Sequence, residues 1–443
     1  MGVVVAPATS WGHAALALVR ASGPGVLALL EPVLEPMHLG TWQPRVPRRV
    51  RFRDERGVFD DGLACWWPGP NSYTGEDLIE MSPHGNPLIV RRLLAACVQE
   101  GAGLAEPGEF TRRAVVNGRI DLLEAEAVDV ACRATSDEGL AIARAALEGK
   151  LGAFVAEVRE RLVASAAELE ARLDWPADEL ATVDDEAVVS ELERLAKLCE
   201  ELAETANAGR RYVEGATVTL VGPTNAGKSS LFNALLGEER ALVHDVAGTT
   251  RDVVESTTRI GNLQVTLCDT AGERETENPV EQAGIDRAHH QREASDLLVL
   301  VLPADRMEEP IQRVLREQTS DQDPVVVFNR IDCAGAKVPE GDEIATCALT
   351  GEGVGLLKQA ISDRLVGMTP KTRALQIASV RQQEILTHTG GLCIEATRAL
   401  SPGGPAVSSD YVHEAIEAID RLTGQLGRED VLSALFARFC IGK

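Results

Sequence analysis

A glycine-rich loop constrains this chain more than any other feature of its sequence. The loop reads Gly222-Pro-Thr-Asn-Ala-Gly-Lys-Ser229. It follows an apolar, strand-like run over Ala216–Val221 and precedes a helix-like run over Ser230–Leu236. This order is the context of a phosphate-binding P-loop, in which backbone N–H groups and the positive end of a helix dipole surround a phosphate. In such a loop Lys228 reaches the β- and γ-phosphates and the Ser229 hydroxyl binds Mg²⁺. The alternative, a plain strand-to-helix turn, does not account for a full-length motif in this context.

Two later strand ends predict the rest of a nucleotide site. Gln264–Cys268 reads as a strand that runs into Asp269-Thr-Ala-Gly272, which supplies a carboxylate on the Mg²⁺ side and a glycine N–H for the γ-phosphate. Pro324–Phe328 reads as another strand and ends in Asn329-Arg-Ile-Asp332, which resembles the guanine-reading motif of GTPases. In that motif the final aspartate accepts hydrogen bonds from guanine N1–H and the 2-amino group, and adenine offers neither. Cys347-Ala-Leu349 resembles the segment that closes on the base, so four elements in the expected order predict a GTPase.

Composition and charge narrow the class of protein. A length of 443 residues predicts two to four domains, and no apolar run of 18 residues is present to span a membrane. The nine cysteines are scattered without a CxxC pair, which predicts a reduced, cytoplasmic protein without a structural zinc site. The net charge of −24 argues against nucleic-acid binding through bulk electrostatics, so any RNA contact must be local or shared with a partner.

The patterning divides the chain into three domains. Residues 1–117 mix strand-like runs with an amphipathic helix over Pro87–Gln99, which predicts an α+β domain. Residues 118–214 and 367–443 form helical flanks around an α/β unit of residues 215–366, so we expect this P-loop unit to be inserted into one all-helical domain. Two separate helical bundles remain the alternative. The expected helices cover 122–175, Glu186–Gly209, Gln376–Leu400, Asp410–Leu426 and Glu429–Phe439, with a loop over Ser401–Pro405.

Outside the α/β unit the residues by themselves predict little chemistry. Four polar residues stand at element ends, where a structural role is the commoner one: Arg20, Glu80, His84 and Arg119. The arginines between Arg45 and Arg56 fit a solvated strand face better than an RNA contact. The C-terminal Lys443 does not suit a prenylation signal, so Cys440 is either a small buried side chain or a functional thiol.

Over its whole length the chain resembles the MnmE (TrmE) family of tRNA-modification GTPases. The segments that carry the resemblance are Ala8-Thr9, Leu18–Gly23, Trp67–Ser72, Thr74–Asp77, His84-Gly85, Pro107–Phe110, Asp121–Ala127, Asn225–Ser230, Ala247–Asp252 and Phe439–Lys443. The stretch Ala247–Asp252 and the C-terminal tail are highly specific in combination. The sequence departs from the family at Ser10–Ala14 and Asn86, where glycines are usual, and at Arg330 and Cys347, where lysine and serine are usual.

The resemblance implies a folate site and two partners. The N-terminal domain would form a homodimer and bind a tetrahydrofolate derivative, 5-formyl or methylene, and the helical domain would carry Cys440 towards it. The implied folate contacts are Arg20, Glu80, Arg119 and Lys443. A flavoprotein that resembles MnmG and uses FAD and NADH would join in a heterotetramer. Together they would add a carboxymethylaminomethyl-type group to C5 of the wobble uridine, position 34, of certain tRNAs.

The resemblance also implies a route for GTP hydrolysis. Glu281 would position or polarise the attacking water, because Glu273 stands where small regulatory GTPases have glutamine. A K⁺ ion would take the place of an arginine finger when two GTPase domains meet. Asp252 would take part directly, although an ion pair with Arg251 that orders the loop explains it equally well. The implied catalytic set is Glu281, Lys228, Asp252 and Cys440, the Mg²⁺ ligands are Ser229, Thr250 and Asp269, and the K⁺ ligands are Asn225, His244, Val246 and Thr249. The implied GTP-binding set is Asn225, Ala226, Gly227, Lys228, Ser229, Ser230, His244, Asp245, Val246, Ala247, Gly248, Thr249, Thr250, Asp269, Thr270, Ala271, Gly272, Asn329, Arg330, Ile331, Asp332, Cys347, Ala348 and Leu349.

Two other functions remain open. Ribosome-assembly GTPases of the Era or Der type lack a unit like residues 1–117 and carry basic RNA-binding domains, whereas this chain is acidic. A GTPase switch scaffold whose folate and tail sites have decayed would hydrolyse GTP without modifying tRNA.

Overall fold

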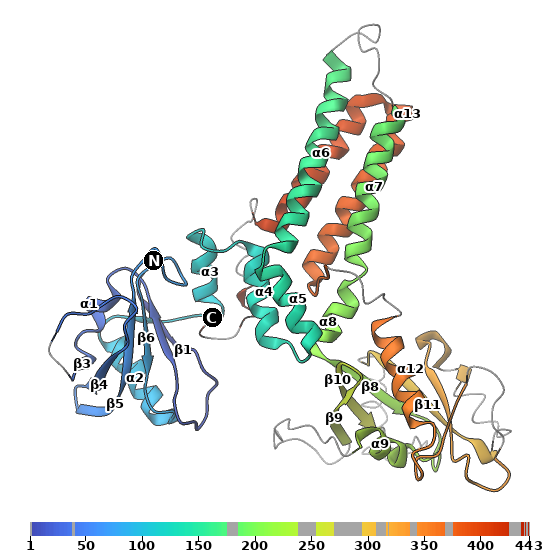
Figure 1. Cartoon of the computed structure of the whole chain (residues 1–443), viewed down its shortest axis with the longest axis horizontal. Coiled ribbons are helices and arrows are strands. Elements are labelled where there is room, and N and C mark those ends of the chain that lie inside the picture. Colours follow the sequence, from blue (N-terminus) through green and yellow to red (C-terminus); the bar gives the residue numbers. More distant parts are fainter. Residues whose placement is uncertain are drawn as a thin grey trace, which may run out of the picture. The chain divides into compact units, whose positions relative to one another are not determined.

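The computed structural model describes residues 2–37, 40–174, 185–237, 254–269, 295–306, 316–317, 319–336, 343–367, 375–424, 436–437, 439 and 442. The chain forms two compact units, and each combines stretches that lie far apart in the sequence (Figure 1). The first unit comprises residues 1–129, 146–193 and 391–443, and the second comprises residues 130–145 and 194–390.

A seven-stranded sheet organises the N-terminal part of the first unit. Its order is β3-β4-β5-β6-β2-β1-β7, antiparallel except for the parallel pair of β1 and β7. The strands are β1 (Val4–Pro7), β2 (Val19–Ser22), β3 (Leu34–Pro36), β4 (Arg48–Asp54), β5 (Gly57–Trp67), β6 (Leu78–Ser82) and β7 (Gly103–Leu104). The solvated strand face predicted for the arginines between Arg45 and Arg56 corresponds to β4, where Val50 and Phe52 are buried and the alternating arginines are mainly exposed.

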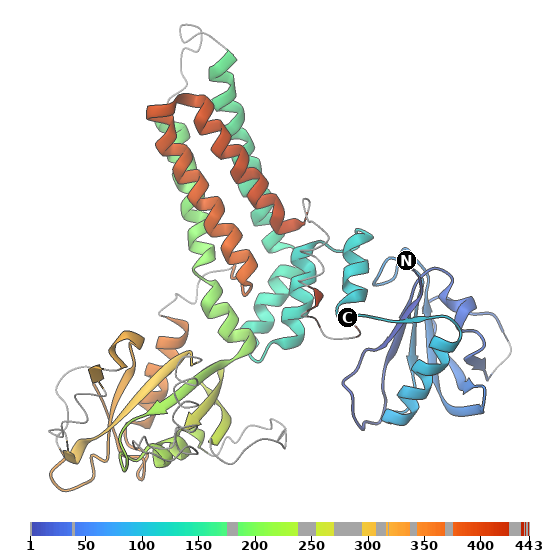
Figure 2. The ribbon, with the colours of Figure 1, turned by 180° about the vertical axis from the view of Figure 1, so that it is seen from behind.

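Helix α2 (Pro87–Gln99) covers one face of this sheet and matches the predicted helix (Figure 2). Its apolar face, which includes Val90, Leu93 and Cys97, joins the core of the sheet. Asn86 begins the helix, because its side chain accepts a hydrogen bond from the backbone N–H of Leu88 at 2.8 Å. The departure from the family at residue 86 is therefore a helix cap. The same part of the chain contains α1 (Val26–Leu30) and α3 (Glu109–Val116).

The helical regions contain more breaks than the sequence predicts. The stretch predicted as helical over 122–175 consists of α4 (Leu122–Arg133), α5 (Asp137–Leu147) and α6 (Lys150–Asp174). The Ser136 hydroxyl accepts from the Gly139 N–H at the start of α5, and Gly149, with φ of 77°, separates α5 from α6. These local hydrogen bonds and the left-handed glycine leave little signal in the apolar spacing.

The single helix predicted over 186–209 is likewise wrong. It consists of α7 (Asp185–Ala203) and α8 (Ala206–Glu214), and the buried Thr205 lies between them and donates to the Leu202 carbonyl at 2.7 Å. By contrast, α13 (Val380–Thr423) consists of two helical segments that meet at Gly404, whose φ is 75°, within the stretch predicted as a loop. Within the first unit, α6 contacts the last part of α13 through the pairs Arg159–Asp420 at 2.7 Å and Glu170–His413 at 2.6 Å.

A six-stranded sheet forms the centre of the second unit, with the order β13-β12-β11-β8-β10-β9. All neighbours are parallel except β9, which is antiparallel to β10. The strands are β8 (Ala216–Val221), β9 (Val254–Ile260), β10 (Leu263–Asp269), β11 (Leu297–Pro303), β12 (Val325–Asn329) and β13 (Ile344–Thr346). The three strands that the sequence predicts in this unit are thus present as β8, β10 and β12.

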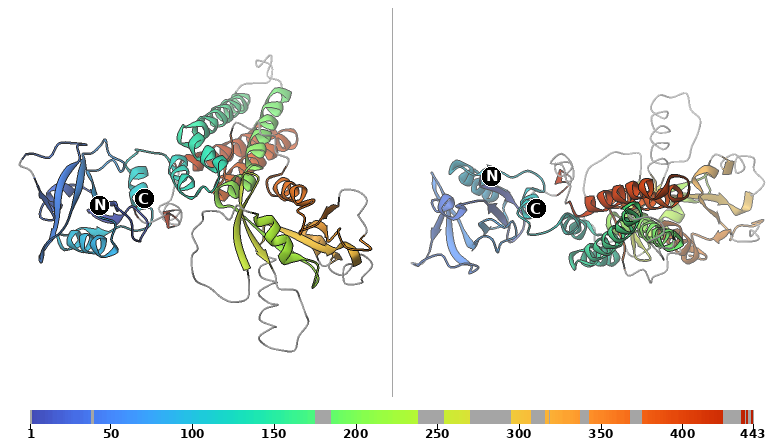
Figure 3. Two further views of the ribbon diagram at one scale, coloured as in Figure 1. Left: turned by 60° about the horizontal axis from the view of Figure 1, so that its bottom comes forward. Right: turned by 90° about the horizontal axis from the view of Figure 1, so that it is seen from above.

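The central strands of this sheet are buried on both faces. All seven residues of β11 are buried, as expected for a parallel strand covered on both sides. One face packs against α9 (Lys228–Leu236) and α12 (Val354–Val366), which share a single apolar core with β8, β10 and β11 (Figure 3). Two short 3₁₀ turns adjoin these strands: η1 (Ala304–Arg306) directly follows β11, and η2 (Ser320–Gln322) precedes β12.

Several cysteines are interior groups. Burial raises the pKa of the Cys97 and Cys393 thiols to about 12 and that of Cys268 to about 11.

Across the described ranges, His, Cys, Asp and Glu side chains form no group of three or more that could hold a metal ion. Nor does any helix in those ranges combine the length and the apolar character that a membrane span requires.

Arg113 of α3 joins separate segments of the first unit. Its side chain is 2% exposed, and its guanidinium donates to Glu109 at 2.7 Å, to Glu76 at 2.9 Å and to the carbonyls of Gly2 and Ser22 at 2.9 and 3.3 Å. One arginine therefore neutralises two largely buried carboxylates and satisfies two backbone carbonyls.

Replacing this arginine is expected to destabilise the first unit. Arg113→Ala leaves Glu76 and Glu109 without their cation, so the free energy of unfolding should fall by about 3–5 kcal/mol. Urea unfolding followed by tryptophan fluorescence reports on this unit, because no tryptophan follows residue 175. The adjacent Arg112→Ala is the control and should change the value by about 0.5 kcal/mol or less. Equal losses in the two variants would contradict the role of Arg113.

A contact between His84 and Asp60 in the same unit predicts that the stability of the fold depends on pH. The Nδ1 atom of His84 lies 2.7 Å from Asp60 Oδ1, and the hydrogen bond and charge of Asp60 raise the pKa of His84. Because folding favours the protonated form, the pair stabilises the fold below about pH 6.5, and this contribution is lost as pH rises through the raised pKa. In an NMR titration, Asp60→Asn should lower the pKa of His84 more than Asp61→Asn does. An unchanged pKa in Asp60→Asn would rule out the pair as its cause.

Candidate functional site

The predicted P-loop joins β8 to α9, and its backbone runs directly against two neighbouring strands. A Cβ atom at Gly222, whose φ is 151°, would lie 2.1 Å from the Val301 carbonyl oxygen of β11. A Cβ atom at Gly227, whose φ is 87°, would lie 2.3 Å from the Asn329 amide nitrogen at the end of β12. Only glycine fits at these two positions, so the glycines of the motif have a steric reason as well as a chemical one.

Lys228 and Ser229 lie where the loop becomes helix α9. The Lys228 side chain is 7% exposed, and its ammonium group donates to the carbonyls of Gly222 and Pro223 at 2.9 and 3.1 Å. The cation is thereby held within the curve of the loop. The Ser229 hydroxyl donates to Asp269 Oδ2 at 2.7 Å, and Asp269 ends β10 beside Leu220 of β8.

The pair of Ser229 and Asp269 fits a magnesium site. The second carboxylate oxygen of Asp269, Oδ1, is buried and has no hydrogen-bond partner among the described residues. Hard oxygen ligands of this kind suit Mg²⁺, which takes one or two protein oxygens and completes its coordination with phosphate and water. Residues 270–272, predicted to meet the γ-phosphate, lie outside the described ranges.

The buried amide of Asn329 connects the P-loop to the segment after β13. Its Nδ2 atom donates to the Ala226 carbonyl at 3.1 Å, while its Oδ1 atom accepts from the Thr346 hydroxyl and the Ala348 N–H, both at 3.2 Å. The side chain is 1% exposed. The first residue of the predicted guanine-reading motif thus has a positioning role.

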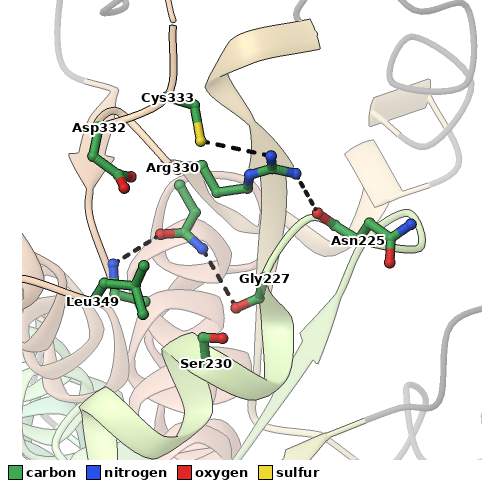
Figure 4. A pocket seen from close by; sticks show the side chains of 9 residues that line it. Asn225, Gly227, Ser230, Arg330, Asp332, Cys333 and Leu349 are labelled. Atoms are coloured by element: carbon green, nitrogen blue, oxygen red, sulfur yellow. Dashed lines mark hydrogen bonds between the residues drawn. The ribbon is translucent and has the colours of Figure 1, made fainter.

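A pocket of about 340 Å³ opens beside this amide (Figure 4). Its lining residues are Asn225, Gly227, Ser230, Asn329, Arg330, Asp332, Cys333, Ala348 and Leu349. They come from the P-loop, the first turn of α9, the end of β12 and the segments that follow β12 and β13. Of the predicted base-contacting residues, five line the pocket and Ile331 does not; the five are Asn329, Arg330, Asp332, Ala348 and Leu349. Cys347 does not line it either, because its side chain is 1% exposed and its backbone bonds to Glu352.

Arg330 occupies the position where the family usually has lysine. Its guanidinium donates to the Asn225 carbonyl of the P-loop at 2.9 Å and reaches Cys333 Sγ at 3.6 Å. A third contact, at 3.1 Å, joins Arg330 to Asp305 Oδ2 in η1. Arg330 therefore links the base pocket to the phosphate loop.

Many predicted nucleotide-site residues lie outside the described ranges. They include the water-positioning Glu281, three of the four K⁺ ligands and one Mg²⁺ ligand. They are His244, Asp245, Val246, Ala247, Gly248, Thr249, Thr250, Arg251, Asp252, Thr270, Ala271, Gly272, Glu273 and Glu281. The remaining predicted residues meet at the carboxyl ends of the parallel strands, where open α/β sheets bind ligands.

The predicted folate contacts in the first unit also lie close to one another. Arg20 of β2 faces Glu80 of β6 in register, and their side chains pair at 2.7 Å. The Arg20 guanidinium stacks over Tyr73 at 5.3 Å from the ring centre, and Arg119 donates to the carbonyl of Ser72 at 3.2 Å. The segment 72–73 therefore connects the three residues.

The C-terminal tail returns to the first strand of the same unit. A Cβ atom at Gly442 would lie 2.0 Å from the Pro7 carbonyl of β1. The rings of Phe436 and Phe439 contact each other in a tilted arrangement, with centres 5.0 Å apart and planes at 59°, and they pack with Leu122 in one apolar cluster. Cys440 and Lys443, predicted to act at the folate site, lie outside the described residues.

Three neighbours of these sites were not predicted from the sequence. Cys333 directly follows the guanine-reading motif, so extending the motif by one residue would have included it. Asp305 and Tyr73 carry no such signal, because each approaches its arginine only through the pairing of distant strands.

Two family models match this chain. The model of the MnmE helical domain matches residues 122–440, and the model of the GTP-binding protein TrmE N-terminus matches residues 3–119. Among solved structures, the G domain of the T. maritima FeoB iron transporter covers 34% of this chain and 98% of its own. The sequence identity is 26% and the TM-score is 0.28.

Full-length relatives carry the name tRNA modification GTPase MnmE. The relative from Akkermansia muciniphila is 36% identical over 449 residues, which cover 99% of this chain and 98% of its own. Those from Roseiflexus castenholzii and Aquifex aeolicus are 37% and 36% identical, and each match covers 99% of both chains. With similarity that extends through both units and a P-loop pocket of the expected make-up, this chain belongs to the MnmE family of tRNA modification GTPases.

Proposed function

We propose that this protein hydrolyses GTP and uses the hydrolysis in the modification of tRNA. The observation that carries the GTP half is the pocket between the P-loop and the ends of β12 and β13, where Asp332 and the phosphate loop meet. A carboxylate at 332 selects guanine, because it accepts from N1–H and the 2-amino group together. The tRNA half rests on the names of the full-length relatives.

We assign the phosphate chemistry to the loop and its neighbours. The loop N–H groups and Lys228 bind the β- and γ-phosphates, and Ser229, Asp269 and Thr250 would hold Mg²⁺, which would supply positive charge beside the phosphates. Glu281 positions the attacking water, and Asp252 orders or assists the same loop. Asn225, His244, Val246 and Thr249 would hold a K⁺ ion when two GTPase domains of a homodimer meet, and its charge would supply electrostatic stabilisation of the transition state.

We further propose that the first unit binds a tetrahydrofolate derivative. Arg20, Glu80 and Arg119 would contact it, since they surround the segment 72–73. The approach of Gly442 to Pro7 supports a site shared with the tail, because Pro7 is paired with Val19, next to Arg20. On this proposal Cys440 and Lys443 complete the site.

The proposed reaction requires a second enzyme and a particular domain arrangement. A flavoprotein similar to MnmG, with FAD and NADH, would supply the redox chemistry for attaching a carboxymethylaminomethyl-type group to C5 of the wobble uridine. We place the GTPase domain at residues 215–366, inserted between helical segments 118–214 and 367–443. The boundaries fall between elements, since α8 ends at Glu214, β8 begins at Ala216 and α12 ends at Val366.

Changing the base-reading carboxylate tests the GTP assignment directly. Asp332→Asn should raise the Kd for GTP on the order of 100-fold, because an amide cannot accept from both guanine donors. The variant should instead gain affinity for xanthosine triphosphate, whose C2 carbonyl accepts from the new amide. Equilibrium binding of fluorescent nucleotides measures both, with Asp323→Asn as the control, since Asp323 pairs with Arg364 on the surface. Unchanged GTP binding in Asp332→Asn would contradict the assigned pocket.

The cation requirement is tested by kinetics. GTP hydrolysis in KCl should exceed that in NaCl at equal ionic strength by about tenfold or more, increasingly so at higher protein concentration. Asn225→Gly should abolish the difference, because glycine keeps the backbone φ of 64° at residue 225 while removing the side-chain ligand. Equal hydrolysis rates in KCl and NaCl would exclude the K⁺ mechanism but would not contradict the proposal that the protein binds GTP.

A further inference from the structure

The Arg330 guanidinium contacts three segments of the second unit. One nitrogen, Nη1, donates to the Asn225 carbonyl of the P-loop at 2.9 Å. The other, Nη2, lies 3.1 Å from Asp305 Oδ2 after β11 and 3.6 Å from Cys333 Sγ. One side chain thus spans the phosphate loop, the end of β11 and the base-reading segment.

Asp305 is placed to hold this arginine. Its side chain is 13% exposed, and its Oδ1 atom is buried with no hydrogen-bond partner in the part of the chain that the structure describes. The neighbouring Arg306 is farther away, at 3.9 Å, and its side chain is 49% exposed. A largely buried carboxylate depends on a close cation, and Arg330 is the closer of the two.

The contact also stabilises unusual backbone geometry on both sides of the pocket. Arg330 and Asn225 both adopt left-handed conformations, with φ of 69° and 64°. Such residues persist where the surroundings hold them in place, and they often do so at ligand sites. Here the Arg330–Asn225 hydrogen bond joins the two strained residues to each other.

The choice of arginine follows from the same geometry. A lysine ammonium is a single point at the end of its stem, whereas the planar guanidinium presents separate nitrogens to separate acceptors. A lysine at 330 could reach the Asn225 carbonyl or the Asp305 carboxylate. To bridge them, its one nitrogen would have to lie within hydrogen-bond distance of both acceptors, whereas the guanidinium uses a separate nitrogen for each.

We propose that Asp305 is a positioning residue for the guanine nucleotide, an inference that rests on the proposed GTP-binding function. By holding Nη2, it directs Nη1 at the P-loop and keeps the aliphatic stem of Arg330 along the base pocket. The base-reading segment and the phosphate loop are thereby held at a fixed spacing before the nucleotide binds, and such preorganisation increases affinity.

The test separates binding from chemistry in the full-length protein. Asp305→Asn keeps the shape of the side chain and removes its charge, so the KM for GTP and the Kd for fluorescent GDP should each rise about tenfold. The kcat at saturating GTP should stay within about twofold, because Lys228, Ser229 and Asp269 are untouched. The exposed Asp323→Asn is the matched control and should alter neither constant. A general loss of folding in Asp305→Asn would lower kcat together with the affinity, whereas a loss of positioning raises only the KM and the Kd.

Arg330→Lys provides a second test that leaves Asp305 in place. It should raise the KM for GTP by about the same factor, because the one lysine nitrogen would have to serve both acceptors. In the double variant, Asp305→Asn should add about twofold or less, since the bridge is already lost. Additive effects in this cycle, or an Asp305→Asn variant whose KM equals that of the wild type, would overturn the proposal.

Failure of the underlying function has a different signature. If the wild-type protein binds neither GDP nor GTP, both the proposed function and the role of Asp305 are wrong. If the wild type binds GDP and Asp305→Asn binds it equally well, only the role of Asp305 is wrong.

Discussion

The nucleotide pocket depends on the buried side chain of Asn329. Its amide bonds to the P-loop, about a hundred residues earlier in the chain, and to the Thr346–Ala348 segment, 17 to 19 residues later. A buried amide with unsatisfied groups costs about 1–3 kcal/mol for each group. Three segments are therefore held at fixed spacing by one residue whose partners cannot be released cheaply. The close approach of Gly227 to the same amide makes glycine necessary in the loop.

The parallel sheet explains why the polar residues converge. Its central strands are largely buried on both faces, and the charged side chain among them, Asp269, lies at a strand end. Asp269 ends β10, Asn329 ends β12, and the P-loop follows β8, all at the same edge. Asp305, just beyond β11, belongs to this edge as well. The fold thus assembles the pocket by terminating adjacent strands.

Arginine, rather than lysine, supplies the cations for the interior ion pairs and hydrogen bonds of the first unit. The sequence contains no lysine before Lys150, and Arg113, Arg20 and Arg119 make the interior polar contacts of the N-terminal sheet and its helices. A planar fork satisfies several acceptors at once, as Arg113 does with two carboxylates and two carbonyls. Arg330, which stands where the family usually has lysine, shows the same preference in the second unit. Exchanging the two cations is therefore not a neutral change in this chain.

Local sequence was sufficient wherever the chemistry is local. The P-loop, the strands β8, β10 and β12, and helix α2 could be predicted, because apolar periodicity and a motif of adjacent residues specify them. The breaks at Ser136, Gly149 and Thr205 could not, because a capping hydroxyl or a left-handed glycine interrupts a helix without changing its apolar spacing. Cys347 matched a motif by position, yet its side chain is buried away from the pocket.

By itself, the sequence determined the class of this protein: a P-loop, a guanine-reading strand end and a family-specific tail identify a tRNA modification GTPase. The tertiary structure alone decided which side chains meet. Asp305 reaches Arg330, Tyr73 underlies Arg20 and Gly442 returns to Pro7 only after strands distant in sequence have paired. The physical reason is that a motif encodes the order of groups along the chain, whereas hydrogen bonds and ion pairs depend on distances of about 3 Å that folding alone creates.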